Sequence, residues 1–376
     1  MPSSTLSPYK QIPETKEDLD WAELVTLDLS LWDKPGGKEK LAAQLEHASQ
    51  HVGFFYVTNF GISQEEVDRQ FALGREFYKL PLDEKLKFYS QEDLDNGELG
   101  EGIVDNIEVY NIPKFDGFHA KAHKQPAVLK EHLDEIEKFS RASLYPLNKT
   151  TIRLMQGQDI HEKVVLKLLR VLATVLELPE DQLLQDHAYN DNGEDHLRYM
   201  HYAARSAEKN KKIGGLYSPG HTDLGTITIL FRQPVAGLQI LNNKEEWKWA
   251  KPMDGTITVN ICGALSALTG GYFKSSVHRV HVPPQDQAHI DRLGVLPNNH
   301  VYLHPITNSP VLQRTEKTSN PFTTLGKRMT VEEWVKVRQT QQQRRKVPVK
   351  ITEDGKYTYH KKDIEILPGL TAMVYN

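Results

Sequence analysis

The stretch "SPGHTDLGTITILF", residues 218–231, places a histidine and an aspartate two positions apart at the start of a strand pattern. A Pro-Gly turn precedes the pair, and the alternating "TITILF" after it predicts a β-strand. Residues i and i+2 of a strand project from the same face, so His221 and Asp223 can bind one ion. The alternative is a turn histidine beside a solvated aspartate, and the local pattern leaves both interpretations open.

Two other triplets in the chain have a histidine followed two positions later by an acid, but neither lies in a strand pattern. His132 and Asp134 belong to a segment whose apolar residues recur at helical spacing, and on a helix positions i and i+2 diverge. His289 and Asp291 lie in a polar loop after two prolines. Only His221 and Asp223 are therefore candidates for a metal site.

A further metal ligand is expected from a different strand, and the best candidate is His278 in "YFKSSVHRVHVPP", residues 272–284. His281 is three positions further on and therefore faces the opposite side of the same strand. Two imidazoles and one carboxylate on a β-scaffold are the ligand set of non-haem Fe(II) oxygenases. A zinc hydrolase can use the same ligands, and either histidine could instead be a hydrogen-bonded structural imidazole.

The rest of the sequence predicts a mostly β protein with helical additions. From residue 196 onward, short segments such as "LRYMHYA", "GLQIL" and "TITVNI" are separated by turn signals, which favours a double-stranded β-helix (jelly-roll) core. Strand and helix patterns alternate before it, in a helical N-terminal module. We divide the chain into an N-terminal module (22–125), a helical segment packing on the core (126–190), the jelly-roll core (191–312) and a C-terminal helix with a closing strand (313–376).

The composition argues against several other classes of protein. The 376 residues include 46 basic and 50 acidic side chains, and the net charge of −4 gives no sign of a nucleic-acid partner. No stretch approaches the roughly twenty apolar residues of a transmembrane helix. The single cysteine, Cys262, excludes an internal disulfide and fits a reducing compartment. We therefore expect a cytoplasmic protein that acts on a small-molecule substrate, without nucleic acid, membrane or an obligate protein partner.

Several motifs, in the same order, make the chain resemble the iron- and 2-oxoglutarate-dependent dioxygenases of the isopenicillin N synthase-like branch, and its fungal members in particular. The N-terminal half carries "VGFFYVTNFGIS" (52–63) and "FYKLPLDEKLKF" (77–88). The C-terminal half carries "GHTDLGTITILF" (220–231), "GLQIL" (237–241), "VNICGALSALTGGYFKSSVHRV" (259–280) and "DRLGV" (291–295). The resemblance implies an oxidoreductase that uses Fe(II), 2-oxoglutarate and dioxygen.

Carried over residue by residue, the resemblance implies that His221, Asp223 and His278 bind iron. It implies that Arg292 grips the distal carboxylate of 2-oxoglutarate, a pairing that suits a planar guanidinium, and that Tyr202 hydrogen-bonds the same carboxylate. The family decarboxylates 2-oxoglutarate to succinate and carbon dioxide while it hydroxylates, desaturates or cyclises a substrate. The alternatives are an ordinary strand-edge cation for Arg292 and a core residue for Tyr202.

The sequence departs from the family's pattern at two positions near these residues. Gly294 stands where a serine usually supplies a hydroxyl, and Met200 stands where an asparagine is often found. If the site has room, a serine at position 294 is expected to leave the affinity for 2-oxoglutarate equal or better. The substrate is expected at the open end of the barrel under the irregular segment 89–125, and its predicted lining comprises Glu108, Tyr110, Asn111 and Phe231.

Two other functions remain open at this point. An oxidase of the same branch that uses no 2-oxoglutarate, such as isopenicillin N synthase or aminocyclopropane-carboxylate oxidase, also keeps the arginine, so Arg292 does not exclude it. A catalytically silent barrel that binds a ligand is the other alternative. The intact set of three candidate metal ligands argues against such a barrel, because a binding module has no need for them.

Overall fold

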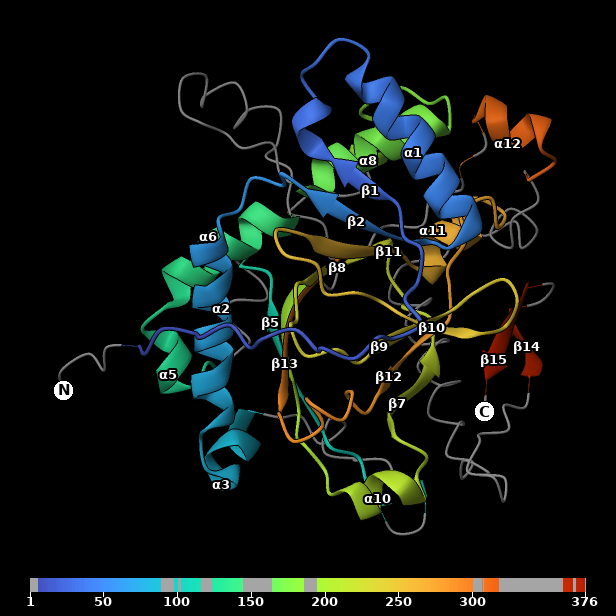
Figure 1. Ribbon diagram of the computed structural model, residues 1–376. Coiled ribbons are helices and arrows are strands. Elements are labelled where there is room, and N and C mark those ends of the chain that lie inside the picture. The colour runs from blue at the N-terminus through green and yellow to red at the C-terminus, as the bar shows by residue number, and fades with distance from the viewer. Residues whose placement is uncertain are drawn as a thin grey trace.

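The computed structural model describes residues 6–88, 98–100, 103–115, 124–144, 164–185, 195–299, 306, 308–317, 361–367 and 370–375. Two β-sheets form its centre, and helices pack on the larger of them (Figure 1). The larger sheet has seven strands, in the order β1 (Thr26–Asp28), β2 (Phe54–Thr58), β11 (Ile257–Ile261), β8 (Ile227–Phe231), β13 (Arg292–Asn299), β6 (His196–Tyr202) and β5 (Ile107–Pro113). Its neighbouring strands are antiparallel except for β1 and β2.

The smaller sheet contains two of the motifs that the sequence singled out. Its order is β10 (Trp247–Trp249), β9 (Leu238–Leu241), β12 (His278–His281) and β7 (Leu216–His221). Because β12 pairs with β7, residues 278 and 221 lie directly opposite each other although 57 positions separate them in the chain. Two hairpins complete the strands: β3 (Glu98–Gly100) with β4 (Ile103–Val104), and β14 (Lys361–Leu367) with β15 (Leu370–Tyr375).

Four longer helices build the outer layer of the described chain: α1 (Gly37–His51), α2 (Gln64–Tyr78), α6 (Leu133–Leu144) and α8 (Val164–Val175). The predicted start of α2 at Ser63 is confirmed by a capping box, in which Ser63 and Glu66 each accept from the other's backbone N–H. Tyr199 of β6 is completely buried, and its hydroxyl donates to Gln70 of α2 at 2.8 Å. This bond fixes α2 against the sheet.

Short helices occupy the connections. They are η1 (Leu29–Leu31), α3 (Leu82–Lys85), η2 (Leu86–Phe88), α5 (Ala127–Lys130), α9 (Gln182–Gln185), α10 (Ala207–Lys212), α11 (Gly263–Leu268) and α12 (Pro310–Arg314). The helical spacing around His132 and Asp134 predicts a helix over 127–146, but a turn at 131–132 separates α5 from α6. The basic, glutamine-rich segment "TVEEWVKVRQTQQQRRK", residues 330–346, which the sequence predicts to be the C-terminal helix, lies outside the described residues.

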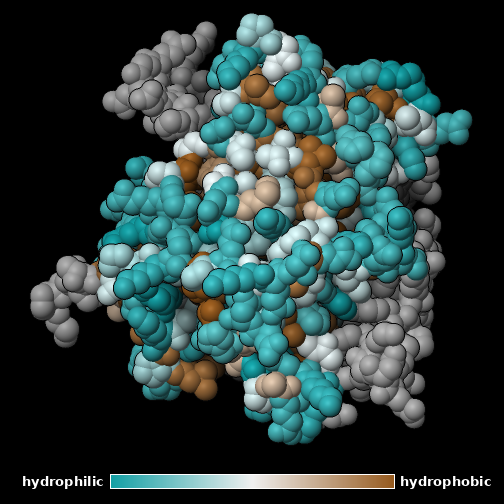
Figure 2. All heavy atoms as spheres, in the orientation of Figure 1, coloured by the Kyte–Doolittle hydropathy of each residue, from teal (hydrophilic) through white to brown (hydrophobic). Residues whose placement is uncertain are grey.

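The predicted fold class, a jelly-roll core with a helical N-terminal module, is confirmed. The prediction of an irregular segment over 89–125 is wrong for residues 107–113, which form β5 and pair along their whole length with β6. The alternating "IEVYNIP" suits such an edge strand. The described part of the chain contains no helix long and apolar enough to cross a membrane, and the face shown in Figure 2 is largely hydrophilic.

Candidate metal and cosubstrate site

The three predicted metal ligands meet at one end of the smaller sheet. His221 ends β7, His278 begins β12 opposite it, and Asp223 follows β7 by two residues. The Nε2 atoms of His221 and His278 lie 3.7 and 3.5 Å from Oδ1 of Asp223. One nitrogen or oxygen from each residue lies within 4.8 Å of the other two. The arrangement therefore gathers two imidazoles and a carboxylate around one point.

Neighbouring groups fix the orientation of each of these side chains. The backbone carbonyls of Pro219 and Ser276 accept from Nδ1 of His221 and His278 at 2.9 and 3.2 Å. Because a carbonyl oxygen can only accept, Nδ1 of each ring carries the hydrogen and Nε2 is the metal-binding nitrogen. Asn260 of β11 donates to Oδ2 of Asp223 at 3.0 Å, which leaves Oδ1 toward the histidines.

The electrostatics of the cluster also suit a cation. Burial raises the pKa of Asp223, but the neighbouring His278 and His221 and the amide of Asn260 outweigh it, and the pKa lies well below its usual range. The carboxylate is therefore ionised at neutral pH. Two neutral imidazoles and one carboxylate fit a divalent transition metal such as Fe(II), with coordination positions left for other ligands. The three side chains therefore suit Fe(II) as ligands.

His281 lies apart from this cluster. Its ring packs edge-on against Trp249 at a centroid distance of 5.6 Å, and its Nδ1 donates to the carbonyl of Val282. Burial lowers the pKa of His281 to about 4, so the ring is neutral. These contacts indicate a structural imidazole.

A cavity runs from the three candidate ligands into the barrel and reaches Arg292 and Tyr202. Arg292 begins β13 and pairs with Tyr202 of β6, and its guanidinium carbon lies 5.6 Å from the centre of the tyrosine ring. The remaining wall is mixed: its apolar residues are Phe54, Met200, Leu230, Leu238, Val280 and Leu296, and its polar residues are Arg198, Thr228, Gln233, Thr258 and Asn260. A bound molecule could therefore contact the metal ligands at one end and the guanidinium at the other.

Arg292 is 4% exposed, and its Nε donates to the backbone carbonyl of Val235 at 3.2 Å. Burial lowers the pKa of this guanidinium to about 10, and the nearby Tyr202 raises it only in part. Within the described residues no carboxylate forms an ion pair with Arg292. A buried cation without an acidic partner is costly, and an anionic ligand at this place would offset that cost.

Two of the predicted substrate residues face away from the cavity that holds the candidate metal ligands. Register places Ile107 and Asn111 of β5 opposite the cavity residues Tyr202 and Arg198, so Glu108 and Tyr110 project from the other face. The ring of Tyr110 packs on Phe77 of α2 at 4.3 Å, and its hydroxyl donates to Gln125. Glu108 forms an ion pair with Lys85 of α3.

Phe231 lies in the core and Asn111 has an indirect link to the cavity. The ring of Phe231 is buried in the main core between Phe60 and Phe139, at centroid distances of 6.2 and 5.0 Å. It does not line the cavity that holds the metal ligands. Asn111 accepts a hydrogen bond of 2.8 Å from Nε of Arg198, which does line it.

Sequence reasoning missed Arg198, Gln233 and Asn260, all of which line the cavity. Asn260 and Arg198 lie on strands β11 and β6. Which side chains of these strands face the cavity depends on pairing with distant segments, so no local pattern predicts the two residues. The glycine at position 294 was the sequence signal for Gln233, because a glycine leaves space that a side chain from another segment can fill. A Cβ at Gly294 would lie 2.0 Å from the Gln233 amide nitrogen, so a serine at position 294 has room only if the end of the Gln233 side chain moves aside.

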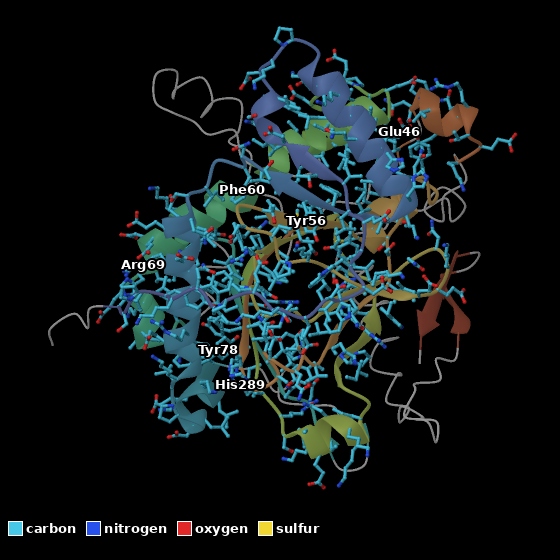
Figure 3. All side chains as sticks on the ribbon, in the orientation of Figure 1. Glu46, Tyr56, Phe60, Arg69, Tyr78 and His289 are labelled. Carbon is cyan, nitrogen blue, oxygen red and sulfur yellow. The ribbon has the colours of Figure 1, made fainter. Side chains whose placement is uncertain are left out.

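On the outer face of β6, His201 joins a cluster of charges. Its two ring nitrogens lie 3.3 Å from Glu108 and 3.2 Å from Asp291, and its ring stacks on Tyr78, which projects from α2 (Figure 3). Burial lowers the pKa of His201, but hydrogen bonds to the two carboxylates raise it by more, to about 9. The imidazolium therefore holds β5, β6 and the start of β13 together.

We expect this cluster to make stability fall at alkaline pH. Because the folded pKa of His201 lies above its ordinary value of 6.5, the stabilisation is complete below about pH 6.5 and is lost as the pH rises through about 9. Urea unfolding should show a loss of free energy of unfolding, on the order of 1–2 kcal/mol after solvent screening, between neutral pH and pH 10. His201→Gln should flatten this dependence, whereas His289→Gln, at an exposed loop position, should leave it unchanged. Equal pH dependence in all three proteins would contradict the assignment.

Comparison with known families agrees with this geometry. The profile described as "non-haem dioxygenase in morphine synthesis N-terminal" matches residues 24–132, and that of the "2OG-Fe(II) oxygenase superfamily" matches residues 194–293. The two matches together span more than half of the 376-residue chain. The second includes the three candidate metal ligands, Tyr202 and Arg292.

Individual proteins support the same assignment. Azadirone synthase LFS from Melia azedarach is 29% identical over 252 residues, which are 64% of this chain and 73% of that protein. A 2-oxoglutarate-dependent dioxygenase from Didymella fabae is 27% identical over 256 residues, 65% of this chain and 75% of that one. A full-length Neurospora crassa protein, solved in complex with alpha-KG, shares the fold, with a TM-score of 0.65 and 21% identity over 87% of this chain and 100% of that chain. The chain therefore belongs to the 2OG-Fe(II) oxygenase superfamily, and it is a dioxygenase that uses Fe(II), 2-oxoglutarate and dioxygen.

Proposed function

We propose that His221, Asp223 and His278 hold the iron, and that Arg292 with Tyr202 binds the distal carboxylate of 2-oxoglutarate in the same cavity. The observation that carries the proposal is the buried guanidinium of Arg292, which has no acidic partner in the described chain and shares the cavity with the three ligands. A short dicarboxylate offers one end to each of these groups.

Iron bound at this site supplies the activation of dioxygen, in which one oxygen atom goes to succinate as 2-oxoglutarate loses carbon dioxide and the other oxidises the substrate. The protein's own residues position the reactants. Asn260 and two backbone carbonyls fix the metal ligands, while Phe54 packs edge-on against His278 at 5.2 Å. The apolar side chains of the wall keep water away from the reacting end, which strengthens the contact between Arg292 and a carboxylate.

We further propose that the substrate is a small organic metabolite with an apolar body, acted on in the cytoplasm as part of secondary metabolism. The six apolar residues that line the cavity support a substrate with an apolar body. The likeness to a protein named azadirone synthase supports the link to secondary metabolism. The single, buried cysteine fits a reducing compartment. We also propose that the chain divides into an N-terminal module (22–125), a helical segment (126–190), the jelly-roll core (191–312) and a C-terminal segment (313–376).

The test is iron-dependent release of succinate from 2-oxoglutarate, measured with and without a panel of lipophilic metabolites. We expect slow release without substrate and faster release with a productive one, together with a product that has lost hydrogen or gained one oxygen atom. Removal of iron with a chelator should stop both. Substrate oxidation that proceeds equally without 2-oxoglutarate would assign the chain to the oxidases of the branch instead.

Asn111 should affect the substrate rather than the cosubstrate. It positions Arg198 at the cavity wall, away from the metal ligands. Asn111→Ala is therefore expected to change the KM for the substrate or the product pattern, and to leave substrate-free decarboxylation of 2-oxoglutarate within about twofold. Tyr110→Phe, on the opposite face of β5, is the control and should change neither. Equal loss of both activities in Asn111→Ala would show that the change disturbs the fold or the iron site.

A further inference from the structure

One polar side chain in the cavity is not among the residues to which the family resemblance gives a role. Gln233 lies just after β8, is 6% exposed, and lines the cavity together with Arg292 and Tyr202. Its amide oxygen is buried and has no hydrogen-bond partner within the described residues. Proteins rarely leave a buried amide oxygen unpaired, because its lost contact with water is not replaced. The unpaired amide oxygen is an acceptor that water or a bound ligand can satisfy, and the N–H₂ group of the same amide is a donor.

The position of this amide is set by a glycine on the neighbouring strand. Gly294 lies two residues after Arg292 on β13, so any side chain at 294 would project from the same face as Arg292. The ideal Cβ at that position would lie only 2.0 Å from the amide nitrogen of Gln233. The glutamine therefore fills the space that a side chain of residue 294 would occupy. The two residues are complementary, since a larger residue at 294 would displace the amide.

The space at 294 is the one in which relatives of this chain usually carry a serine. The serine hydroxyl and the amide N–H₂ are both hydrogen-bond donors. The amide nitrogen of Gln233 lies close to where the hydroxyl would be, on the same face as Arg292. Compared with the family's pattern, this chain has no hydroxyl donor at position 294 of β13, and it has the Gln233 amide donor in the loop after β8.

The guanidinium of Arg292 lines the same cavity as the Gln233 amide. A Cβ at Gly237 would lie 3.0 Å from its Nε, and the carbonyl of Val235 accepts from the same nitrogen. Its other nitrogens are therefore the ones available to a ligand. A carboxylate bound to them would have the Gln233 amide beside it, and this extra donor would strengthen the contact.

We propose that Gln233 is a cosubstrate-binding residue that replaces the family's serine and donates a hydrogen bond to the distal carboxylate of 2-oxoglutarate. The inference rests on the proposed function, because it requires that Arg292 binds this carboxylate. Gln233 and Gly294 then form one unit, in which each residue is functional only with the other. The unpaired amide oxygen is satisfied by water or by the substrate when the cavity is filled.

The experiment is an anaerobic titration of the Fe(II)-loaded full-length protein with 2-oxoglutarate, followed by the visible charge-transfer band and by the shift in melting temperature. Gln233→Leu keeps the volume but removes the donor, so it should weaken 2-oxoglutarate binding about tenfold. Without ligand, its melting temperature should equal or exceed that of the wild type, because no buried polar atom is left unpaired. Gln233→Glu places a second negative charge beside the carboxylate and should weaken binding further.

A paired substitution separates a binding role from a packing role. Gln233→Ala should lose affinity as Gln233→Leu does, because both changes remove the amide donor. The double variant Gln233→Ala with Gly294→Ser restores the family's serine and should return to within about threefold of the wild-type affinity. Wild-type affinity in Gln233→Leu, or no recovery in the double variant, would overturn the inference. Absence of any 2-oxoglutarate binding by the wild type would instead overturn the proposed function, and the inference with it.

Discussion

Replacing Asp223 by alanine is expected to lower substrate turnover by more than about a hundredfold while the protein stays folded. Its carboxylate is the one anionic group among the three candidate ligands, and its Oδ1 faces both histidines. Without it, two neutral imidazoles remain, which hold Fe(II) weakly. The sheets do not depend on the carboxylate, because β7 and β12 pair through their backbones. Iron content after gel filtration, succinate release and the circular-dichroism melting curve together measure the effect.

His221→Ala and His278→Ala should behave in the same way, and two controls show whether the effect is specific. Asp134→Ala removes an equivalent carboxylate from α6, remote from the cavity, and His281→Ala removes the neighbouring imidazole of β12. Both should keep most of the activity and all of the bound iron. If His281 proved essential and His278 dispensable, the assignment of the metal-binding face of β12 would be wrong.

The substitution Arg292→Ala should weaken 2-oxoglutarate binding roughly tenfold to a hundredfold. Losing one partner of a charge-assisted contact costs about 1.5–3 kcal/mol, and each factor of ten corresponds to about 1.4 kcal/mol. The apolar surroundings of the guanidinium favour the upper part of this range, because Arg292 is 4% exposed and solvent screens the contact little. The dissociation constant is measured by titrating the anaerobic Fe(II) protein and following the charge-transfer band.

Arg232→Ala is the matched control for this experiment. Arg232 also has a mostly buried side chain, but its guanidinium forms ion pairs with Glu14 and Asp254, so it needs no ligand. Its loss should lower the melting temperature and leave the affinity for 2-oxoglutarate unchanged. Iron binding should be intact in both arginine variants. If Arg292→Ala bound 2-oxoglutarate as tightly as the wild type, another cation would have to hold the distal carboxylate.

Patterns local in the chain were enough to predict the fold class and the set of candidate metal ligands. Strand β8 is visible in the alternation of "TITILF", but it begins after the pair. His221 ends β7 and Asp223 lies two residues beyond it, so the connection between β7 and β8, and not the alternation of one strand, brings the two side chains together. His278 followed from the short strand before two prolines, although the sequence did not show that it pairs with His221. The motif order supplied Arg292 and Tyr202, which the structure places side by side.

The tertiary structure decided which side chains reach the cavity, because this depends on the pairing of strands that are far apart in sequence. The segment "IEVYNIP" gave the substrate candidates Glu108, Tyr110 and Asn111, but pairing with β6 turns the first two toward α2 and α3. A shift of one residue in that register would have reversed the outcome. Likewise, the missing hydroxyl at Gly294 was apparent in the sequence, whereas the Gln233 amide that fills its place was not. Only the packing of the loop after β8 against β13 brings these two residues together, since 61 positions of chain separate them.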